Sequence, residues 1–286
     1  MESQNIINSL NMLSEKIIKN IDDKVYKLLD DIMRIDEKIL KVEPLKLILK
    51  INNIELIQTL ARSLIMIFTI CFILKQLIAI YNGSKCENIF LYLTKILVIS
   101  ILVTNGYWFC EQILNLFGMI TDCVDKIIEF MINKPATFNN LKGIILSVDD
   151  LMKNDALSID GLIKGMISFG IINVLISFSV RYVKVIFLIL TAPFSFMFLA
   201  SDSTRGIFET WFKLIITNLS VQVFIKFIIL IPLAVTDKKG MLFKVILLGT
   251  IYIIFKLNDL VNHIMANISI FSSNKEKLWG MNGDKK

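Results

Sequence analysis

The sequence predicts an all-α, polytopic membrane protein with about five transmembrane helices, an amino-terminal amphipathic helix and an apolar segment kinked at Pro193. The first observation is composition: 55% of the 286 residues are hydrophobic, only 20% are charged, and the mean hydropathy is +0.67. The second is distribution, because charges gather near the start of the chain and long apolar stretches follow. A water-soluble domain could not bury all of these stretches, since much of its surface stays in water.

Residues 1–55 are predicted to form a charged amphipathic helical region. Apolar side chains recur at steps of three or four, which places them on one face of a helix. They are Leu10, Leu13, Ile17, Ile21, Val25, Leu28, Ile32, Ile35 and Ile39. Acids and bases nearly cancel here, which excludes a basic arm for nucleic acid. Two interpretations remain open: a helix lying along the membrane, or one packing on the helices of a partner. No secretory signal is visible.

Residues 56–110 are predicted to contain two transmembrane helices. A spanning helix needs about 20 mainly apolar residues, and the stretches 56–81 and 89–110 meet this requirement. A turn with Gly83 separates them.

Residues 111–160 are predicted to form a polar, acidic loop domain outside the cytoplasm. Residues 112–160 include seven acidic and four basic residues, which gives a net charge of −3. An amphipathic helix from 112 to 133 is expected within it, ended by Pro135.

Residues 161–257 are predicted to hold three transmembrane helices. The stretch 165–201 is apolar except around Arg181 and Lys184, and as one helix it would be about 54 Å long, too long for a bilayer. We therefore expect a span over 161–184, then the segment 185–201 kinked at Pro193 and held inside protein. Spans over 212–235 and 241–257 follow, and residues 258–286 form an amphipathic and then basic tail.

Charge bias predicts a location in the cytoplasmic membrane with the carboxyl terminus in the cytoplasm. With the amino terminus outside, twelve basic residues near span ends lie inside and five outside, in agreement with the positive-inside rule. Inside are Lys75, Lys85, Lys95, Arg181, Lys184, Arg205, Lys213, Lys256, Lys275, Lys277, Lys285 and Lys286. Outside are Arg62, Lys164, Lys238, Lys239 and Lys244. If the chain turns back at Lys184, six spans replace five and the assignment changes.

The sequence does not predict an enzyme. It carries no phosphate-binding loop, no H-E-x-x-H motif and no nucleophile elbow, and its lone His263 cannot complete a metal site. The four cysteines fit no disulfide or metal framework and are interpreted as small apolar side chains. No catalytic residue, metal ligand or cofactor is therefore expected.

Two sets of residues are candidates for a structural or transport role. Gly161, Gly165 and Gly170 have a spacing that lets helices approach closely. Arg181, Lys184, Glu209 and Lys213 could line a polar path, because charges beside membrane spans tend to face an interior or the headgroups. The competing interpretation is that these charges extend to an interface and form a surface ion pair.

A short pattern lies at and after the kink: Ala192-Pro193-Phe194, then Ser203-Thr204-Arg205-Gly206, then Glu209-Thr210-Trp211-Phe212. This pattern resembles the TrbL family of inner-membrane subunits of type IV secretion and conjugation systems, the VirB-type sixth component. Ala192, Pro193, Thr204, Arg205 and Trp211 fill the characteristic places, and the likeness extends over residues 161–257. The chain departs from the family in its short length, its charged amino-terminal helix and its lysine-rich tail.

The resemblance implies a channel or scaffold subunit of a conjugative secretion system that helps pass a DNA–protein complex across the membrane. It further implies a homo-oligomer whose partners are other membrane subunits and separate ATPases. The alternative function is a secondary transporter for a small solute. That alternative predicts matching broken helices in two halves of the chain, and the sequence shows one Pro-broken apolar segment.

Overall fold

The computed structural model describes residue 9 and residues 23–35, 51–83, 89–149, 159–201, 204–235 and 240–278. Within these ranges every regular element is a helix, which confirms the predicted all-α class. Four of these helices are long and apolar enough to cross a membrane, and a bent pair could supply a fifth span. The chain is therefore built as a multi-pass membrane protein.

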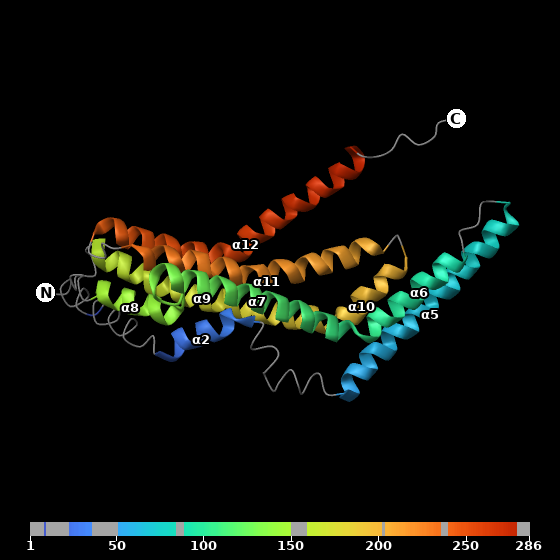
Figure 1. Ribbon diagram of the computed structural model, residues 1–286, viewed down its shortest axis with the longest axis horizontal. Helices are drawn as coiled ribbons and strands as arrows, with labels where there is room; N and C mark the ends of the chain where they lie inside the picture. The colour runs from blue at the N-terminus through green and yellow to red at the C-terminus, as the bar shows by residue number, and fades with distance from the viewer. Residues whose placement is uncertain are drawn as a thin grey trace. The chain divides into compact units, whose positions relative to one another are not determined.

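The helices are labelled in Figure 1. They are α2 (Asp23–Met33), α5 (Ile51–Tyr81), α6 (Ile89–Thr104), α7 (Gly106–Ile132), α8 (Phe138–Asp149), α9 (Ile159–Leu190), α10 (Ala192–Met197), the 3-10 helix η1 (Phe198–Ala200), α11 (Arg205–Ala234) and α12 (Met241–Leu278). The long apolar stretches are Glu55–Tyr81, Gly165–Leu190, Arg205–Ala234 and Met241–Ile264.

The chain divides into two compact units. Unit 1 comprises Met1–Arg34, Ile120–Arg181 and Thr217–Lys286, and unit 2 comprises Ile35–Met119 and Tyr182–Ile216. In unit 1, parts of α7, α9, α11 and α12 lie side by side (Figure 1) and share one apolar core that includes Ile128, Phe178, Ile225 and Leu247. Their outward surface is also apolar: Phe169 and Leu242, for example, are 68% and 75% exposed. Helices that are apolar all round are typical of membrane spans.

Helix α2 packs against α8 of its own chain and contributes to the core of unit 1. The predicted apolar face is wrong in part, because Leu28 is exposed whereas Tyr26, Leu29 and Met33 are buried. The helix therefore presents a neighbouring face to the core. This contact lies within the chain, and the two interpretations of residues 1–55, membrane surface or partner helices, stay predictions for the exposed side of α2. The remaining periodic residues before Asp23, and Ile39, lie outside the described residues.

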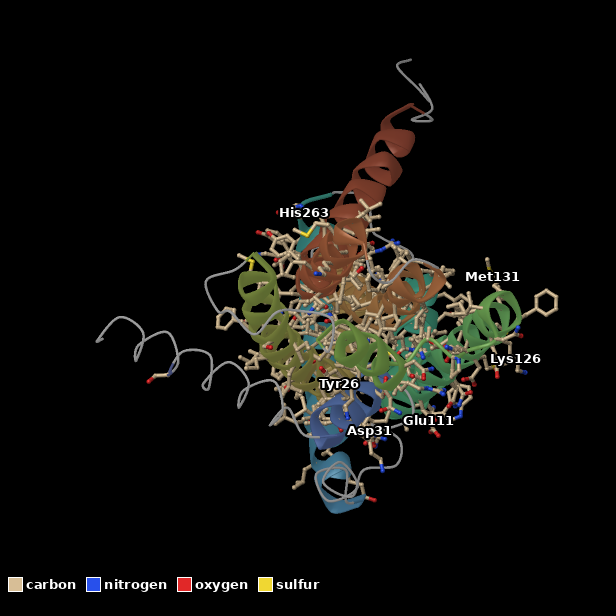
Figure 2. The ribbon with its side chains drawn as sticks, turned by 90° about the vertical axis from the view of Figure 1, so that its left-hand side faces the viewer. Tyr26, Asp31, Glu111, Lys126, Met131 and His263 are labelled. Atoms are coloured by element: carbon tan, nitrogen blue, oxygen red, sulfur yellow. The ribbon has the colours of Figure 1, made fainter. Side chains whose placement is uncertain are left out.

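The predicted loop domain over residues 111–160 is not a separate body in the described part of the chain. Its first portion belongs to α7, which ends where Asn133 adopts a positive φ of 52°. Helix α8 follows, and both helices contribute to the core of unit 1. Lys126 and Met131 lie on the outer side of α7 (Figure 2) and are exposed. Asp122, Asp125 and Glu129 therefore lie on a helix that contributes to the core of unit 1.

In unit 2, α5 and α6 pack together, and α10 packs on both. The Phe72 and Tyr92 rings stack between α5 and α6, and the Tyr92 hydroxyl donates to the Phe68 carbonyl over 3.3 Å. The predicted span over 89–110 is interrupted, because α6 ends at Thr104 and α7 begins at Gly106 with a bend of 67° between them. Unit 2 therefore contains two helix breaks, one between α6 and α7 and one between α9 and α10.

Candidate functional site

The break in α9 lies just before Pro193, as the sequence predicts for a kinked segment. Proline lacks an N–H and its ring collides with the carbonyl four residues earlier, so a helix cannot continue unchanged through it. Helix α9 stops at Leu190, Thr191 forms the joint, and Pro193 occupies the first turn of α10, where the missing N–H costs nothing.

Side chains from other helices satisfy carbonyl groups at this break. The buried indole of Trp211 donates from Nε1 to the Leu188 carbonyl over 2.9 Å. The Tyr107 hydroxyl lies 3.4 Å from the Leu190 carbonyl and donates to it. These two contacts tie α11 and α7 to the last turn of α9, directly beside the break.

Four aromatic side chains pack together beside the break. The ring centroid of Phe196 lies 5.3 Å from that of Phe109 and 5.4 Å from those of Phe208 and Trp211. Gly106, at the start of α7, allows the close approach, since a Cβ there would lie 3.3 Å from the Phe196 ring. The two helix breaks of unit 2 therefore lie against each other.

The five residues that carry the resemblance are here called the hinge cluster: Ala192, Pro193, Thr204, Arg205 and Trp211. Ala192 and Pro193 are buried in α10. The Thr204 hydroxyl donates to the Phe198 carbonyl over 2.7 Å, which fixes the turn before α11. Arg205 begins α11, and its Nε lies 3.0 Å from Glu209 Oε1.

The four residues of the predicted polar path differ in burial. Arg181 is fully buried, and its Nε donates to the Asn218 carbonyl over 2.9 Å. Lys184, three residues further along α9, is exposed, Glu209 is exposed, and Lys213 is half-buried. Of the four residues Arg181 alone faces an interior, within unit 1.

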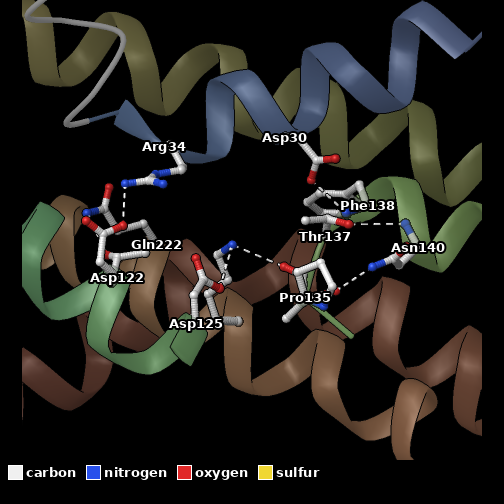
Figure 3. A network of polar contacts seen from close by, with 12 residues as sticks. Asp30, Arg34, Asp122, Asp125, Pro135, Thr137, Phe138, Asn140 and Gln222 are labelled. Carbon is white, nitrogen blue, oxygen red and sulfur yellow. Dashed lines mark hydrogen bonds and ion pairs between the residues drawn. The ribbon is translucent and has the colours of Figure 1, made fainter. Parts of the chain in front are cut away.

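Unit 1 instead contains a buried polar ladder on α11, made of Asn218, Gln222 and Lys226. The three residues are 8%, 0% and 2% exposed. Gln222 Nε2 donates to the Thr121 hydroxyl over 3.1 Å. Lys226 Nζ lies 2.9 Å from Asp125 Oδ1 and donates to the Ala136 carbonyl over 3.1 Å (Figure 3). The ladder thus joins α11 to α7 and to the turn before α8.

The same network holds α2 in place (Figure 3). The Asp30 carboxylate accepts hydrogen bonds from the backbone N–H groups of Phe138 (2.6 Å) and Asn139 (3.1 Å), so it caps α8 from another helix. Arg34 Nη2 lies 2.7 Å from Asp122 Oδ1. Burial raises the pKa of the Asp30 carboxyl above its usual value, although the two N–H groups and the charge of Lys226 act to lower it.

The ladder was missed in the sequence, although a signal was present. Asn218, Gln222 and Lys226 recur every four residues inside an apolar stretch, which places them on one helical face. Polar groups so placed tend to face a bundle interior. The break at Asn105 had a signal as well, because Asn-Gly is a common turn dipeptide.

The three glycines differ in their surroundings. A Cβ on Gly170 would lie 2.6 Å from Ile251 Cγ2, so α9 and α12 approach closely there. A Cβ on Gly165 would meet nothing within 4 Å. The surroundings of Gly161 lie outside the described part of the structure. The close contact is therefore local to Gly170.

Among the described residues no group of three His, Cys, Asp or Glu side chains is placed to hold a metal ion. His263 is exposed on α12 (Figure 2). Comparison of the chain with family models, curated proteins and solved structures gives no match.

Proposed function

We propose that this protein is a non-enzymatic channel or scaffold subunit of a conjugative type IV secretion system, where it helps pass a DNA–protein substrate across the cytoplasmic membrane. Its partners would be further copies of itself, other membrane subunits and the ATPases that supply energy. The carboxyl terminus would lie in the cytoplasm.

The hinge cluster is the observation that supports this proposal. The residues of the TrbL-like pattern lie within one 20-residue segment, and three of them have distinct parts in the structure of the break and the turn that follows it. Pro193 ends α9, Trp211 pairs with the Leu188 carbonyl at the break, and Thr204 fixes the turn into α11. A break stabilised in this way gives unit 2 a fixed bend around which membrane subunits can pack.

A mating assay tests the proposal. We expect Pro193→Leu combined with Trp211→Ala to leave membrane insertion intact and to reduce transfer. Trp211→Phe keeps an aromatic ring but removes the donor to Leu188, so it should reduce transfer in the same direction. Trp108→Ala is the control, because this tryptophan is 60% exposed in the same unit. Wild-type transfer by the double variant would refute a role for the hinge cluster. Genes for secretion ATPases and a relaxase next to the gene for this protein would support its assignment to a conjugative secretion system.

A secondary transporter remains the second candidate, and two structural observations favour it. Transporters place broken helices at their binding sites, and the breaks at Asn105 and Thr191 lie against each other in unit 2. Buried charges such as Lys226 and Arg181 are also frequent on substrate paths. Solute uptake by the purified protein in liposomes, lost in Lys226→Gln, would favour this candidate over the secretion subunit.

A further inference from the structure

A pocket in unit 2 lies between α6 and the first turns of α11. Its volume is about 650 Å³. Most of the wall is apolar and includes Phe90, Val98 and Phe208, while Lys95 of α6 and Arg205 and Glu209 of α11 supply the charges. The pocket thus combines an apolar trough with three charged side chains.

The charges of this pocket favour an anion. Two cations and one carboxylate line it, which gives a net charge of +1. The Arg205 and Glu209 side chains are 65% and 62% exposed, so their ion pair is open to solvent and weak. An incoming phosphate can therefore contact Arg205 while Glu209 turns away.

The position of the pocket favours a lipid as the source of that anion. Arg205 is the first residue of the long apolar stretch of α11, which places it where a membrane span meets the headgroups. The trough is open at its side, because Phe90 and Val98 are 79% and 49% exposed. An acyl chain can lie along these residues while its phosphate stays beside the cations.

We propose that this pocket binds an anionic phospholipid, with its phosphate between Lys95 and Arg205 and an acyl chain along Phe90, Val98 and Phe208. Basic pockets between membrane helices commonly bind anionic lipids in this manner. The inference does not depend on the proposed secretion function, and it assigns Arg205 a ligand beyond its place in the hinge cluster.

The buried Trp211 provides a local reporter, since its ring centroid lies 5.7 Å from that of Phe208 in the pocket wall. The test uses the full chain with Trp108→Phe and Trp279→Phe, purified in a neutral detergent. Brominated phosphatidylglycerol is titrated in and quenching of Trp211 is measured, with brominated phosphatidylcholine in a parallel series. We expect saturable quenching by phosphatidylglycerol at about tenfold lower concentration than by phosphatidylcholine.

Four variants locate the binding. Lys95→Gln with Arg205→Gln should weaken phosphatidylglycerol binding about tenfold or more. Lys184→Gln with Lys256→Gln removes the same charge from exposed positions outside the pocket, so binding should be unchanged. Glu209→Gln removes the opposing carboxylate and should strengthen binding. Val98→Phe narrows the trough without altering charge or adding a second tryptophan, and it should abolish saturable quenching.

Several results would overturn the proposal. Equal quenching by both lipids would indicate unselective contact with acyl chains. Loss of quenching on addition of inorganic phosphate would indicate a site for a free anion. Unchanged binding in the Lys95 and Arg205 double variant, or weaker binding in Glu209→Gln, would show that the charges of this pocket do not recognise the lipid.

Discussion

At the scale of single residues, Lys226 makes the contact that matters most for unit 1. Its ammonium group is buried and pairs with Asp125, whose side chain is 24% exposed. Removing one partner of a buried pair leaves the other charge uncompensated. We therefore expect Lys226→Met to lower the free energy of unfolding in detergent by about 3 kcal/mol.

The control for Lys226→Met is Lys256→Met. Lys256 lies 3.7 Å from Asp259 in an exposed pair. Its substitution should therefore change the free energy of unfolding by less than about 0.5 kcal/mol. Adding Asp125→Asn to Lys226→Met should recover much of the loss, because no charge is then left unpaired. Equal unfolding curves for Lys226→Met and wild type would contradict this account of the ladder.

Gly170 gives a second prediction at this scale. An alanine there must displace Ile251 Cγ2, which belongs to a β-branched side chain with little rotamer freedom. Overpacking of this kind costs about 1–3 kcal/mol, so Gly170→Ala should lower the thermal midpoint. Gly165→Ala meets nothing and should leave it unchanged or slightly raised by better helix propensity. A reversed order of the two variants would show that α9 and α12 do not approach at Gly170.

At the scale of elements, docking of α2 should depend on pH through Asp30. Burial raises the pKa of this carboxyl above the ordinary value of 3.8, so the docked helix binds a proton more readily than the undocked one. The resulting stabilisation is complete below pH 3.8 and is lost as the pH rises through the higher pKa of the docked state.

A spin label on Leu28→Cys, an exposed position of α2, measures this docking. The mobile fraction should grow as the pH rises in the protein with Asp30. In Asp30→Asn it should stay constant, because an amide keeps an acceptor for the α8 N–H groups but does not titrate. The same pH dependence in both proteins would assign the effect to another group.

The elements also show how far the sequence can be interpreted. The apolar stretches in α5, α9, α11 and α12 were predictable, because length and composition decide whether a helix can span a bilayer. The break at Pro193 was predictable from a missing N–H. The buried face of α2 was not, since Leu28 and Leu29 are equally apolar and contact with α8 decides between them. Nor did spacing alone show that Gly170 is close to α12 while Gly165 is not.

At the scale of the whole molecule, both units expose many large apolar side chains and bury several polar ones. Trp211 binds the Leu188 carbonyl beside the break in unit 2, and Lys226 pairs with Asp125 in unit 1. A chain arranged in this way needs lipid around it, because so much apolar surface would associate in water. Every functional proposal above depends on this arrangement.

The most direct test of whether the exposed apolar helices lie in lipid is labelling of single cysteines with a membrane-impermeant maleimide. The native cysteines are first replaced: Cys71, Cys86, Cys110 and Cys123. Ile70 and Ile253 are exposed apolar residues within the long stretches of α5 and α12, whereas Gly83 lies in the turn after α5. We predict that a cysteine at Gly83 reacts from one side of intact membranes, and that cysteines at Ile70 and Ile253 react only after the membrane is dissolved. Rapid labelling at Ile70 and Ile253 in intact membranes would contradict the account.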